Sequence, residues 1–292
     1  MAAQAFHDRD GWVWMDGSFI PHRDAKVHVL THALHYASCV FEGERAYGGV
    51  VFKSHEHSQR LHQSARILGF ELPYSAEELD RVKRELVAKQ GFSDCYLRAL
   101  AWRGSEQMGV ATARSDVHVA VSAWEWGDYF ADKMKGIRLM IAPWRRPAPD
   151  CAPTNSKAAG LYMICTLSKH AAADAGFDDA MMFDWRGQVA EATGANIFFV
   201  RDGVLHTPTP DCFLNGLTRQ TVIAQARQRG VEVIERAIFP NELATFSEAF
   251  LTGSAAEITP IREIAGLAFK PGAMCEQAMS DYAALTRRKN AA

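Results

Sequence analysis

The middle of the chain carries a closely spaced series of short apolar segments separated by turn-forming residues, and this pattern constrains the fold most. The segments are residues 180–183, 189–192, 196–200 and 204–207. The turns between them include Asp184 to Gly187 and Arg201-Asp202-Gly203. Short strands at this spacing are typical of barrel-like sheets. The pattern therefore predicts a barrel-like β domain.

Helical segments and a proline-rich stretch surround these strands. Residues 158–175 have helical spacing with no internal proline, and residues 218–230 form a predicted helix that precedes a strand at 231–238. The stretch from Trp144 to Pro153 contains three prolines, which exclude a regular helix. We interpret this stretch as a loop just inside a second domain.

The N-terminal part begins with two predicted hairpins. Asp16-Gly17 joins residues 12–15 to residues 18–20, and this dipeptide favours the type I′ turn that matches the twist of paired strands. Gly48-Gly49 joins residues 40–47 to residues 50–52. Both joints therefore predict antiparallel pairs.

Two helices and two longer strands follow the hairpins. We expect the first helix to have Ser54 as its N-cap and to stop at Gly69. Ser75 and Glu78 have the spacing of a capping box, which predicts a second helix that ends near Gly91. Strands are expected at residues 95–102 and 117–126.

These elements predict an α+β protein of two domains. The 292 residues suffice for two domains of ordinary size, and 48% hydrophobic with 23% charged residues is the profile of a globular protein. We expect a smaller N-terminal α/β domain over residues 1–126, an interdomain loop over residues 127–136 and a larger barrel-like C-terminal domain over residues 137–292.

Charge and cysteine usage indicate the compartment and exclude some partners. A formal net charge of -2 gives no reason to expect nucleic acid or an anionic membrane as a partner. The N-terminus has no apolar run of the kind found in signal peptides, and no run approaches the ~18 residues that span a bilayer. The six cysteines are scattered without a CxxC pair, which favours free thiols. We therefore expect a cytoplasmic protein.

Several catalytic motifs are absent. A zinc protease motif starting at His55-Glu56 would need histidine at position 59, which is Gln59. His32 and His35 lack an acidic third ligand, so no metal site is predicted. The phosphate-binding loop motifs with repeated glycines do not occur, and the stretch at Ser254 lacks the second glycine of a serine hydrolase elbow.

Four features remain, and together they suit a phosphorylated pyridine aldehyde. Lys157 has small neighbours and could form a Schiff base, although a solvated lysine is the simpler interpretation of it alone. Glu191 is a carboxylate among small residues that could face a cationic ring nitrogen or be a loop charge. Thr218 opens a helix, where free amides favour phosphate, or merely caps it. The turn at Ser254 offers a second anion cradle.

The chain resembles bacterial branched-chain aminotransferases from about Trp12 to Tyr282. FEGER at residues 41–45, EHSQRL at 56–61 and MGV at 108–110 resemble their N-terminal domain. SKAAGLY at 156–162, EATGANIF at 191–198, NGLTRQ at 215–220 and TGSAAEITP at 252–260 resemble the signatures of the fold-type IV pyridoxal 5′-phosphate (PLP) family, in order and spacing. The resemblance implies two domains, with PLP held by a C-terminal pseudo-barrel domain.

The resemblance also implies the roles of individual residues. Lys157 is expected to carry PLP as a Schiff base and to move the proton between substrate Cα and cofactor, Glu191 to pair with the ring nitrogen, and Tyr162 to bond the ring oxygen. The other cofactor-binding residues implied are Arg60, Thr193, Leu217, Thr218 and Ser254.

The implied substrate site is apolar with one cation. Its residues are Tyr96 and the amides of Ser254-Ala255 for the substrate carboxylate, Phe41, Trp126 and Tyr129 as the wall, and Arg98 for the distal carboxylate of glutamate. Tyr36, Met108 and Val110 are expected to come from a neighbouring subunit, which would make a homodimer the minimum catalytic unit.

The resemblance has departures and leaves rivals. Ser254 stands where threonine is expected, Ala195 replaces a common glutamate beside Glu191, and the loop at 103–107 is unusual. Glu44 is acidic where many relatives are apolar, which would alter substrate preference if it faced the pocket. The reaction expected is branched-chain L-amino acid:2-oxoglutarate transamination. D-amino acid or (R)-amine transaminases and aminodeoxychorismate lyase share the fold, and a PLP-free binding module is the non-enzymatic alternative.

Overall fold

A computed structural model describes residues 5–112, 114–127 and 133–287. The chain forms two compact units, which are described separately. Unit 1 comprises Met1–Gly127 and the short segment Ser156–Gly160, and unit 2 comprises Asp128–Asn155 and Leu161–Ala292. The short segment, expected in the C-terminal domain, is grouped with unit 1 because its main chain bonds to strands and helices there. Of the residues described, no helix is long and apolar enough to cross a membrane.

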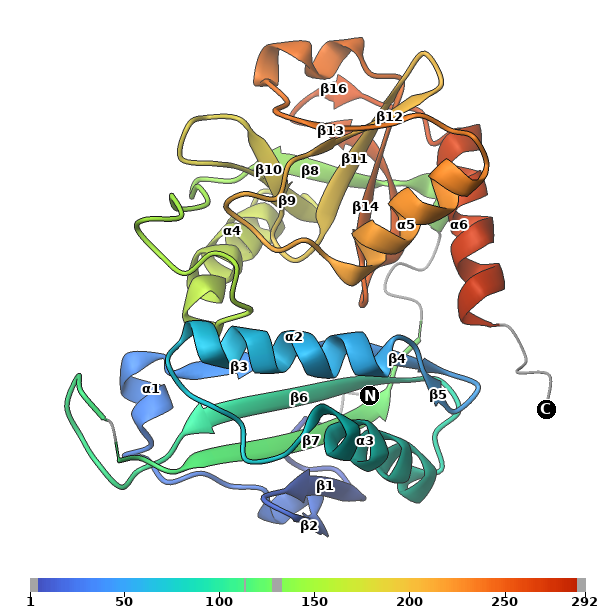
Figure 1. The fold of residues 1–292 in the computed structure, drawn as a ribbon. Coiled ribbons are helices and arrows are strands. Elements are labelled where there is room, and N and C mark those ends of the chain that lie inside the picture. The colour runs from blue at the N-terminus through green and yellow to red at the C-terminus, as the bar shows by residue number, and fades with distance from the viewer. Residues whose placement is uncertain (1–4, 113, 128–132, 288–292) are drawn as a thin grey trace. The chain divides into compact units, whose positions relative to one another are not determined.

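Unit 1 is a seven-stranded sheet with two helices on one face (Figure 1). The strand order is β2-β1-β7-β6-β4-β5, and β3 also pairs with β6. The strands are β1 (Trp12–Met15), β2 (Ser18–Pro21), β3 (Cys39–Phe41), β4 (Glu44–Tyr47), β5 (Val50–Val51), β6 (Cys95–Arg103) and β7 (Val117–Glu125). The helices are α1 (His32–Tyr36), α2 (Ser54–Ile67) and α3 (Ala76–Gln90), with a short 3-10 turn η1 (His22–Asp24).

The side chains of β6 alternate between the two faces of this sheet. Leu97, Ala99 and Ala101 are fully buried in a core that also contains Leu61 of α2 and Leu86 of α3. The residues between them on β6 point to the opposite face, because successive side chains of a strand alternate. That second face carries the predicted substrate residues Tyr96 and Arg98.

The local predictions for unit 1 are confirmed with two corrections. Asp16 and Gly17 both have positive φ, 47° and 95°, as the type I′ hairpin turn requires. The capping box of α3 is present. Ser54 is not the N-cap of α2: Lys53 is, with φ of 52°, because the Ser54 hydroxyl donates to Asp80 instead.

The second correction concerns the strand expected at 40–47, which is broken. Strand β3 ends at Phe41 and β4 begins at Glu44, with Glu42 and Gly43 between them. The break turns the side chain of Glu42 toward α2, where it bonds to Arg60.

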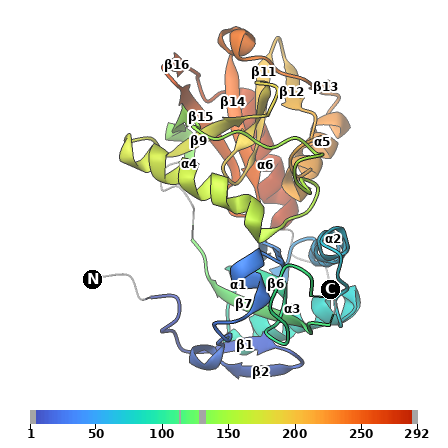
Figure 2. The ribbon, with the colours of Figure 1, turned by 90° about the vertical axis from the view of Figure 1, so that its left-hand side faces the viewer.

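Unit 2 is a curled nine-stranded sheet, as the short-strand pattern predicted (Figure 2). The order is β10-β9-β8-β15-β14-β11-β12-β13, and β16 also pairs with β15. The Val189 amide of β10 donates to the Ile238 carbonyl just after β13, at 2.9 Å. Because this bond joins the first strand to the end of the last, the sheet is nearly closed into a barrel.

The bounds of unit 2 differ from the sequence expectations mainly at helix starts. The strands are β8 (Ile137–Ile141), β9 (Asp179–Phe183), β10 (Val189–Ala192), β11 (Asn196–Arg201), β12 (Val204–Pro208), β13 (Val233–Arg236), β14 (Glu248–Gly253), β15 (Glu257–Ile264) and β16 (Leu267–Ala268). The helices are α4 (Met163–Asp174), α5 (Leu217–Gln228) and α6 (Ala273–Thr286), with 3-10 turns η2 (Lys133–Lys135), η3 (Ala159–Tyr162) and η4 (Pro240–Thr245).

Three helices complete unit 2. α4 packs on β9, whereas α5 and α6 pack together against β14 (Figure 1). The helix expected to begin at residue 158 starts as η3 and becomes α-helical only at Met163. Gly216, rather than Thr218, is the N-cap of α5. Thr218 therefore lies inside the first turn.

Candidate active site

Lys157 is attached to the rest of unit 1 by hydrogen bonds from its backbone amide and to its backbone carbonyl. Its amide donates to Ser64 Oγ of α2 at 3.0 Å, and its carbonyl accepts from the Phe41 amide at 3.1 Å. The preceding Ser156 hydroxyl donates to the Ser64 carbonyl at 3.0 Å. The half-buried side chain places Nζ 5.0 Å from the centre of the Phe41 ring. Lys157 is therefore held against the sheet face that carries the predicted substrate residues.

The same Phe41 ring contacts a second cation. The Arg98 guanidinium carbon lies 4.6 Å from the ring centre, and Arg98 Nη2 donates to the Tyr96 hydroxyl at 3.4 Å. The Tyr96 ring lies 5.1 Å from that of Trp126. Four of the predicted substrate residues and the predicted reactive lysine thus lie together in unit 1.

Gly43 makes room for the Tyr96 hydroxyl. A Cβ on Gly43 would lie 1.9 Å from that oxygen, far inside van der Waals contact. The glycine of FEGER is therefore a packing requirement of the tyrosine beside it.

Arg60, the predicted phosphate ligand of unit 1, is held by Glu42. Nε and Nη2 donate to the two carboxylate oxygens at 2.7 and 2.8 Å. Glu42 is fully buried, and His57 Nδ1 lies 2.6 Å from its Oε2. Burial alone would raise the pKa of Glu42, but Arg60 and His57 outweigh it and hold the pKa well below its usual range.

Glu44 does not face the surface where it could alter substrate preference. Its carboxylate is fully buried and lies 2.8 Å from the equally buried Nζ of Lys83 on α3. Lys83 also donates to Ser58 Oγ at 2.8 Å. Burial raises the pKa of Glu44, although Lys83 opposes the shift. Lys83 lies on α3, far from β4 along the chain, and no sequence motif marks it as the partner of Glu44.

The residues expected to act from a neighbouring subunit are exposed in unit 1. Val110 is 85% exposed, and Tyr36 and Met108 are 42% and 46% exposed. Tyr36 ends α1, and the loop that carries Met108 and Val110 contacts the same helix through His32. The ring nitrogens of His32 lie 2.6 Å from Ser38 Oγ and 2.9 Å from the Gly109 carbonyl. Tyr129, also expected in the substrate wall, lies outside the described residues.

Glu191 of β10 is the centre of the second group, in unit 2. It is 6% exposed, and its two oxygens have different partners. Arg146 Nη2 lies 2.7 Å from Oε1, and Asn196 Nδ2 donates to Oε2 at 3.1 Å. The sequence pattern predicts only a loop for the stretch that contains Arg146. Two adjacent arginines, Arg145 and Arg146, gave no signal of which one is buried.

Asn196 links Glu191 to the start of α5. Its Oδ1 accepts from the Gly216 amide at 3.1 Å, and its Nδ2 also donates to the Leu214 carbonyl at 3.0 Å. A Cβ on Gly216 would lie 2.3 Å from that Oδ1, so glycine is required. No side chain caps α5 at Gly216, and Thr218 is buried in its first turn. The amides of the first turn therefore remain available to an anion.

The remaining predicted cofactor residues of unit 2 have varied surroundings. The Thr193 hydroxyl donates to Asp179 at 2.6 Å, so toward a cofactor it can only accept. Tyr162 ends η3 and packs with the core beneath α4. Ser254 and Ala255 are half-buried in the turn between β14 and β15.

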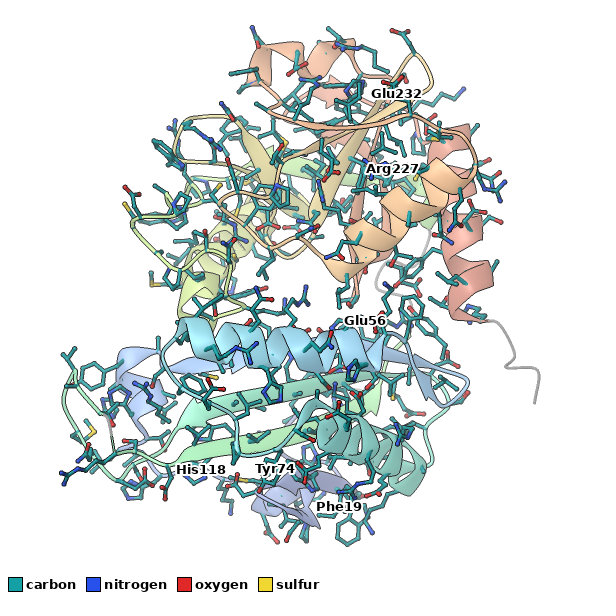
Figure 3. The ribbon with its side chains drawn as sticks, in the orientation of Figure 1. Phe19, Glu56, Tyr74, His118, Arg227 and Glu232 are labelled. Atoms are coloured by element: carbon teal, nitrogen blue, oxygen red, sulfur yellow. The ribbon has the colours of Figure 1, made fainter. Side chains whose placement is uncertain are left out.

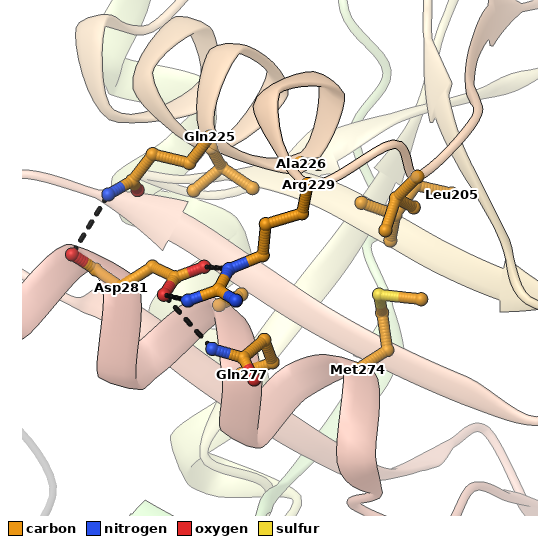
Figure 4. A pocket seen from close by; sticks show the side chains of 10 residues that line it. Leu205, Gln225, Ala226, Arg229, Met274, Gln277 and Asp281 are labelled. Atoms are coloured by element: carbon orange, nitrogen blue, oxygen red, sulfur yellow. Dashed lines mark hydrogen bonds and ion pairs between the residues drawn. The ribbon is translucent and has the colours of Figure 1, made fainter.

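Two hollows away from these groups do not match the predicted chemistry. Among the described residues, a pocket between α5 and α6 is lined mainly by aliphatic groups and bordered by the Arg229–Asp281 ion pair (Figure 4). Its volume of about 20 Å³ suits a single water. In unit 1, an open acidic hollow is lined by Asp16, Tyr74 and His118. Figure 3 labels the last two of these side chains.

One group of side chains has metal-ligand spacing within the described residues. The ligand atoms of Asp184, Asp211 and Cys212 lie within 4.8 Å of one another. Arg186 donates to both aspartates, so its charge already balances part of theirs. Burial raises the pKa of Cys212 to about 12, which keeps the thiol protonated and a poor ligand.

Comparison with known proteins gives matches over nearly the whole chain. The model of the family described as amino-transferase class IV matches residues 39–264. A branched-chain-amino-acid aminotransferase of Pseudomonas aeruginosa is 40% identical over 265 residues, which are 89% of this chain and 86% of that protein. A solved branched-chain aminotransferase of Thermoproteus uzoniensis with norvaline has a TM-score of 0.93 and 37% identity, covering 97% of each chain. A further solved branched-chain aminotransferase, of T.th., is complexed with N-(5′-phosphopyridoxyl)-L-glutamate. It has a TM-score of 0.92 and 37% identity, covering 97% of this chain and 96% of that one.

Proposed function

The chain belongs to the class IV aminotransferase family, and we propose that it reversibly transfers the amino group of leucine, isoleucine or valine to 2-oxoglutarate. One observation carries the choice of substrate. Lys157 and Arg98 both lie against the ring of Phe41, so the reactive amine, an apolar wall and one cation are neighbours in unit 1. A branched side chain suits the wall, and the distal carboxylate of glutamate suits the guanidinium.

The residues present fit PLP, the cofactor of this family. Its phosphate needs donors, and α5 has an uncapped N-terminus with a buried threonine in the first turn. Its ring nitrogen needs an acid, and Glu191 is a buried carboxylate held from both sides. Next to Asn196, the buried Thr252 hydroxyl has no partner among the described residues and can serve as a further donor.

When bound, PLP supplies an electron sink that lowers the barrier to removing the Cα proton. We assign the covalent link to Lys157 Nζ, which would hold the cofactor and, when free, would take up the Cα proton of the substrate. The other assignments are Glu191 to the ring nitrogen, Tyr162 to the ring oxygen, Thr193 as an acceptor, and Arg60, Leu217, Thr218 and Ser254 to the phosphate.

Substrate binding is assigned to polar groups for the carboxylate and to an aromatic wall for the side chain. The substrate carboxylate is assigned to the Tyr96 hydroxyl and to the amides at Ser254 and Ala255. The side chain is assigned to Phe41, Trp126 and Tyr129, with Arg98 for the distal carboxylate of glutamate. The phosphopyridoxyl adduct bound by the T.th. relative contains glutamate, which supports glutamate as the second substrate.

We assign a cytoplasmic homodimer as the working form. The exposed apolar groups of Tyr36, Met108 and Val110 support contact with a second copy of the chain, since such groups gain by burial. All six cysteines are free, and five of them are wholly or partly buried, which suits a reducing compartment.

A half-reaction panel tests the proposed substrate class. PLP-loaded protein is mixed in turn with L-leucine, L-glutamate, D-alanine and an (R)-amine, and conversion to the amino form of the cofactor is followed by absorbance. We expect turnover with L-leucine and L-glutamate. Turnover confined to D-alanine or the (R)-amine would overturn the proposal and favour the rival transaminases. A lyase would form no amino form of the cofactor with L-leucine.

A further inference from the structure

Arg146 is a buried arginine whose place is fixed by its own main chain. Its amide donates to the Phe183 carbonyl at the end of β9, at 2.8 Å, and its backbone forms a parallel bridge with Asp184. The residue is 8% exposed, whereas its neighbour Arg145 is exposed. The main chain therefore aims the Arg146 side chain into unit 2, where Nη2 lies 2.7 Å from Glu191 Oε1.

The two oxygens of Glu191 thus face two donors. Arg146 donates to Oε1, and Asn196 Nδ2 donates to Oε2. An ionised carboxylate accepts at both oxygens, whereas a protonated one must use one oxygen as a donor. Neither Arg146 nor the side-chain amide NH2 of Asn196 can accept a hydrogen bond from a protonated Glu191. The arrangement consequently favours the ionised form of Glu191.

Burial acts in the opposite direction. A carboxyl group removed from water binds its proton more tightly unless a positive charge compensates. Arginine keeps its charge at any physiological pH, so its compensation is permanent. Burial lowers the pKa of Arg146, but Glu191, Cys165 and Tyr162 outweigh burial and raise it above its ordinary value.

We infer that Arg146 is a positioning residue that keeps Glu191 ionised and oriented, so that the shared proton stays on the ring nitrogen of the cofactor. This inference rests on the proposed function, since it concerns the same ring nitrogen. Without Arg146, the buried carboxyl would retain the proton and the ring would be the neutral pyridine, a weaker electron sink. The alternative is that Arg146 only anchors the proline-rich segment to β9.

The two interpretations predict different cofactor selectivity, which can be measured at equilibrium without turnover. Apo protein is titrated with PLP and with its 1-deaza analogue, in which a C–H group replaces the ring nitrogen. An ionised Glu191 has a partner in the protonated nitrogen but none in the C–H group. Wild type should prefer PLP by about tenfold or more, the value of one charge-assisted hydrogen bond. If Arg146 only anchored the proline-rich segment, replacing it would change the affinities for PLP and for the 1-deaza analogue by the same factor.

The variants separate the outcomes. We expect Arg146→Met to lose most of the preference for PLP, Arg146→Lys to keep part of it, and the exposed neighbour Arg145→Met to keep all of it. Glu191→Gln should abolish the preference for PLP. The double variant Glu191→Gln with Arg146→Met should then have the same ratio of affinities for PLP and the 1-deaza analogue as Glu191→Gln alone. If Arg146→Met fails to fold, Arg146→Lys and Arg146→Gln carry the comparison.

Each outcome bears on a definite claim. An Arg146→Met protein that keeps the wild-type preference for PLP overturns the inference while leaving the proposed function intact. Wild-type protein that binds neither ligand overturns the proposed function itself, and the inference with it.

Discussion

Arg60 and Glu42 form a two-bond ion pair in unit 1, with Nε to Oε1 at 2.7 Å and Nη2 to Oε2 at 2.8 Å. The pairing fixes the plane of the guanidinium, because both bonds lie along one edge of it. Glu42 lies in the break between β3 and β4, and Arg60 lies on α2. An arginine assigned to phosphate is thus oriented by a carboxylate that needs no contact with the cofactor.

Glu42→Gln should weaken PLP binding by about tenfold, because an amide leaves the guanidinium with one good acceptor and no balancing charge. Titration of the apo protein with PLP measures the effect. Glu85→Gln is the matched control, since Glu85 pairs with Arg81 at 3.1 Å on the exposed side of α3. Equal PLP affinities for Glu42→Gln and wild type would show that Arg60 needs no such support.

Glu42 also makes stability depend on pH in a definite direction. Its pKa is depressed in the folded protein, whereas in the unfolded chain it titrates near 4.5. The stabilisation is therefore complete above that value and is lost as pH falls below it, when the unfolded chain takes up a proton and the folded protein does not. The free energy of unfolding of wild type should exceed that of Glu42→Gln by about 3–5 kcal/mol at pH 7. Denaturant curves at pH 7 and pH 4 should show this gap narrowing; a gap that widens at pH 4 contradicts the assignment.

The buried pair of Lys83 and Glu44 should behave as a unit. Lys83→Met leaves a buried carboxylate unpaired and should lower the free energy of unfolding by about 3–5 kcal/mol. Lys83→Met with Glu44→Met removes both charges and should recover most of the loss. Denaturant unfolding of the single and double variants measures the coupling. Additive losses would mean that the two groups do not interact, despite the 2.8 Å separation.

Elements that depend on neighbouring residues were predictable from the sequence. The turn at Asp16-Gly17 and the capping box of α3 each involve residues at most three apart, and both are confirmed. The curled sheet of unit 2 was predictable for a similar reason, since its short strands and turns follow one another along the chain. Where a side chain had a distant partner, the local pattern misled. Ser54 resembled a cap but donates to Asp80.

Motifs in the sequence mark single residues of the candidate site and not the surroundings of those residues. The motifs singled out Lys157, Glu191 and Arg60, but not the residues that hold them. Lys157 is bonded to Ser64, 93 positions earlier in the chain, and Glu191 is paired with Arg146 from a proline-rich stretch. Such partners are chosen by the fold and not by spacing. Glu44 of β4 is a further case, because its buried partner Lys83 lies on α3, 39 positions later in the chain.

Lys157→Ala should reduce transamination of L-leucine by at least about a hundredfold, because it removes both the covalent link and the base for the Cα proton. Circular dichroism should show an unchanged fold, since the main-chain bonds of Lys157 do not involve its side chain. The exposed Lys270 is a control whose replacement by alanine should leave the rate unchanged. Normal turnover of leucine by Lys157→Ala would remove the basis of the assignment.

Gly43→Ala should disturb the substrate wall through Tyr96. The added Cβ would lie 1.9 Å from the tyrosine hydroxyl and 2.9 Å from its Cζ, so the ring must move. We expect an overpacking cost of about 1–3 kcal/mol and a raised KM for leucine, because Tyr96 also bonds Arg98.

Tyr96→Phe removes the nearest clashing atom, so the double variant should be more stable than Gly43→Ala alone. Gly127→Ala is the matched control, as its Cβ would meet no atom of the described part of the chain within 4 Å. Unfolding midpoints and leucine KM values measure both effects. If the double variant were no more stable than Gly43→Ala alone, the contact with the Tyr96 hydroxyl would not be the reason that position 43 requires glycine.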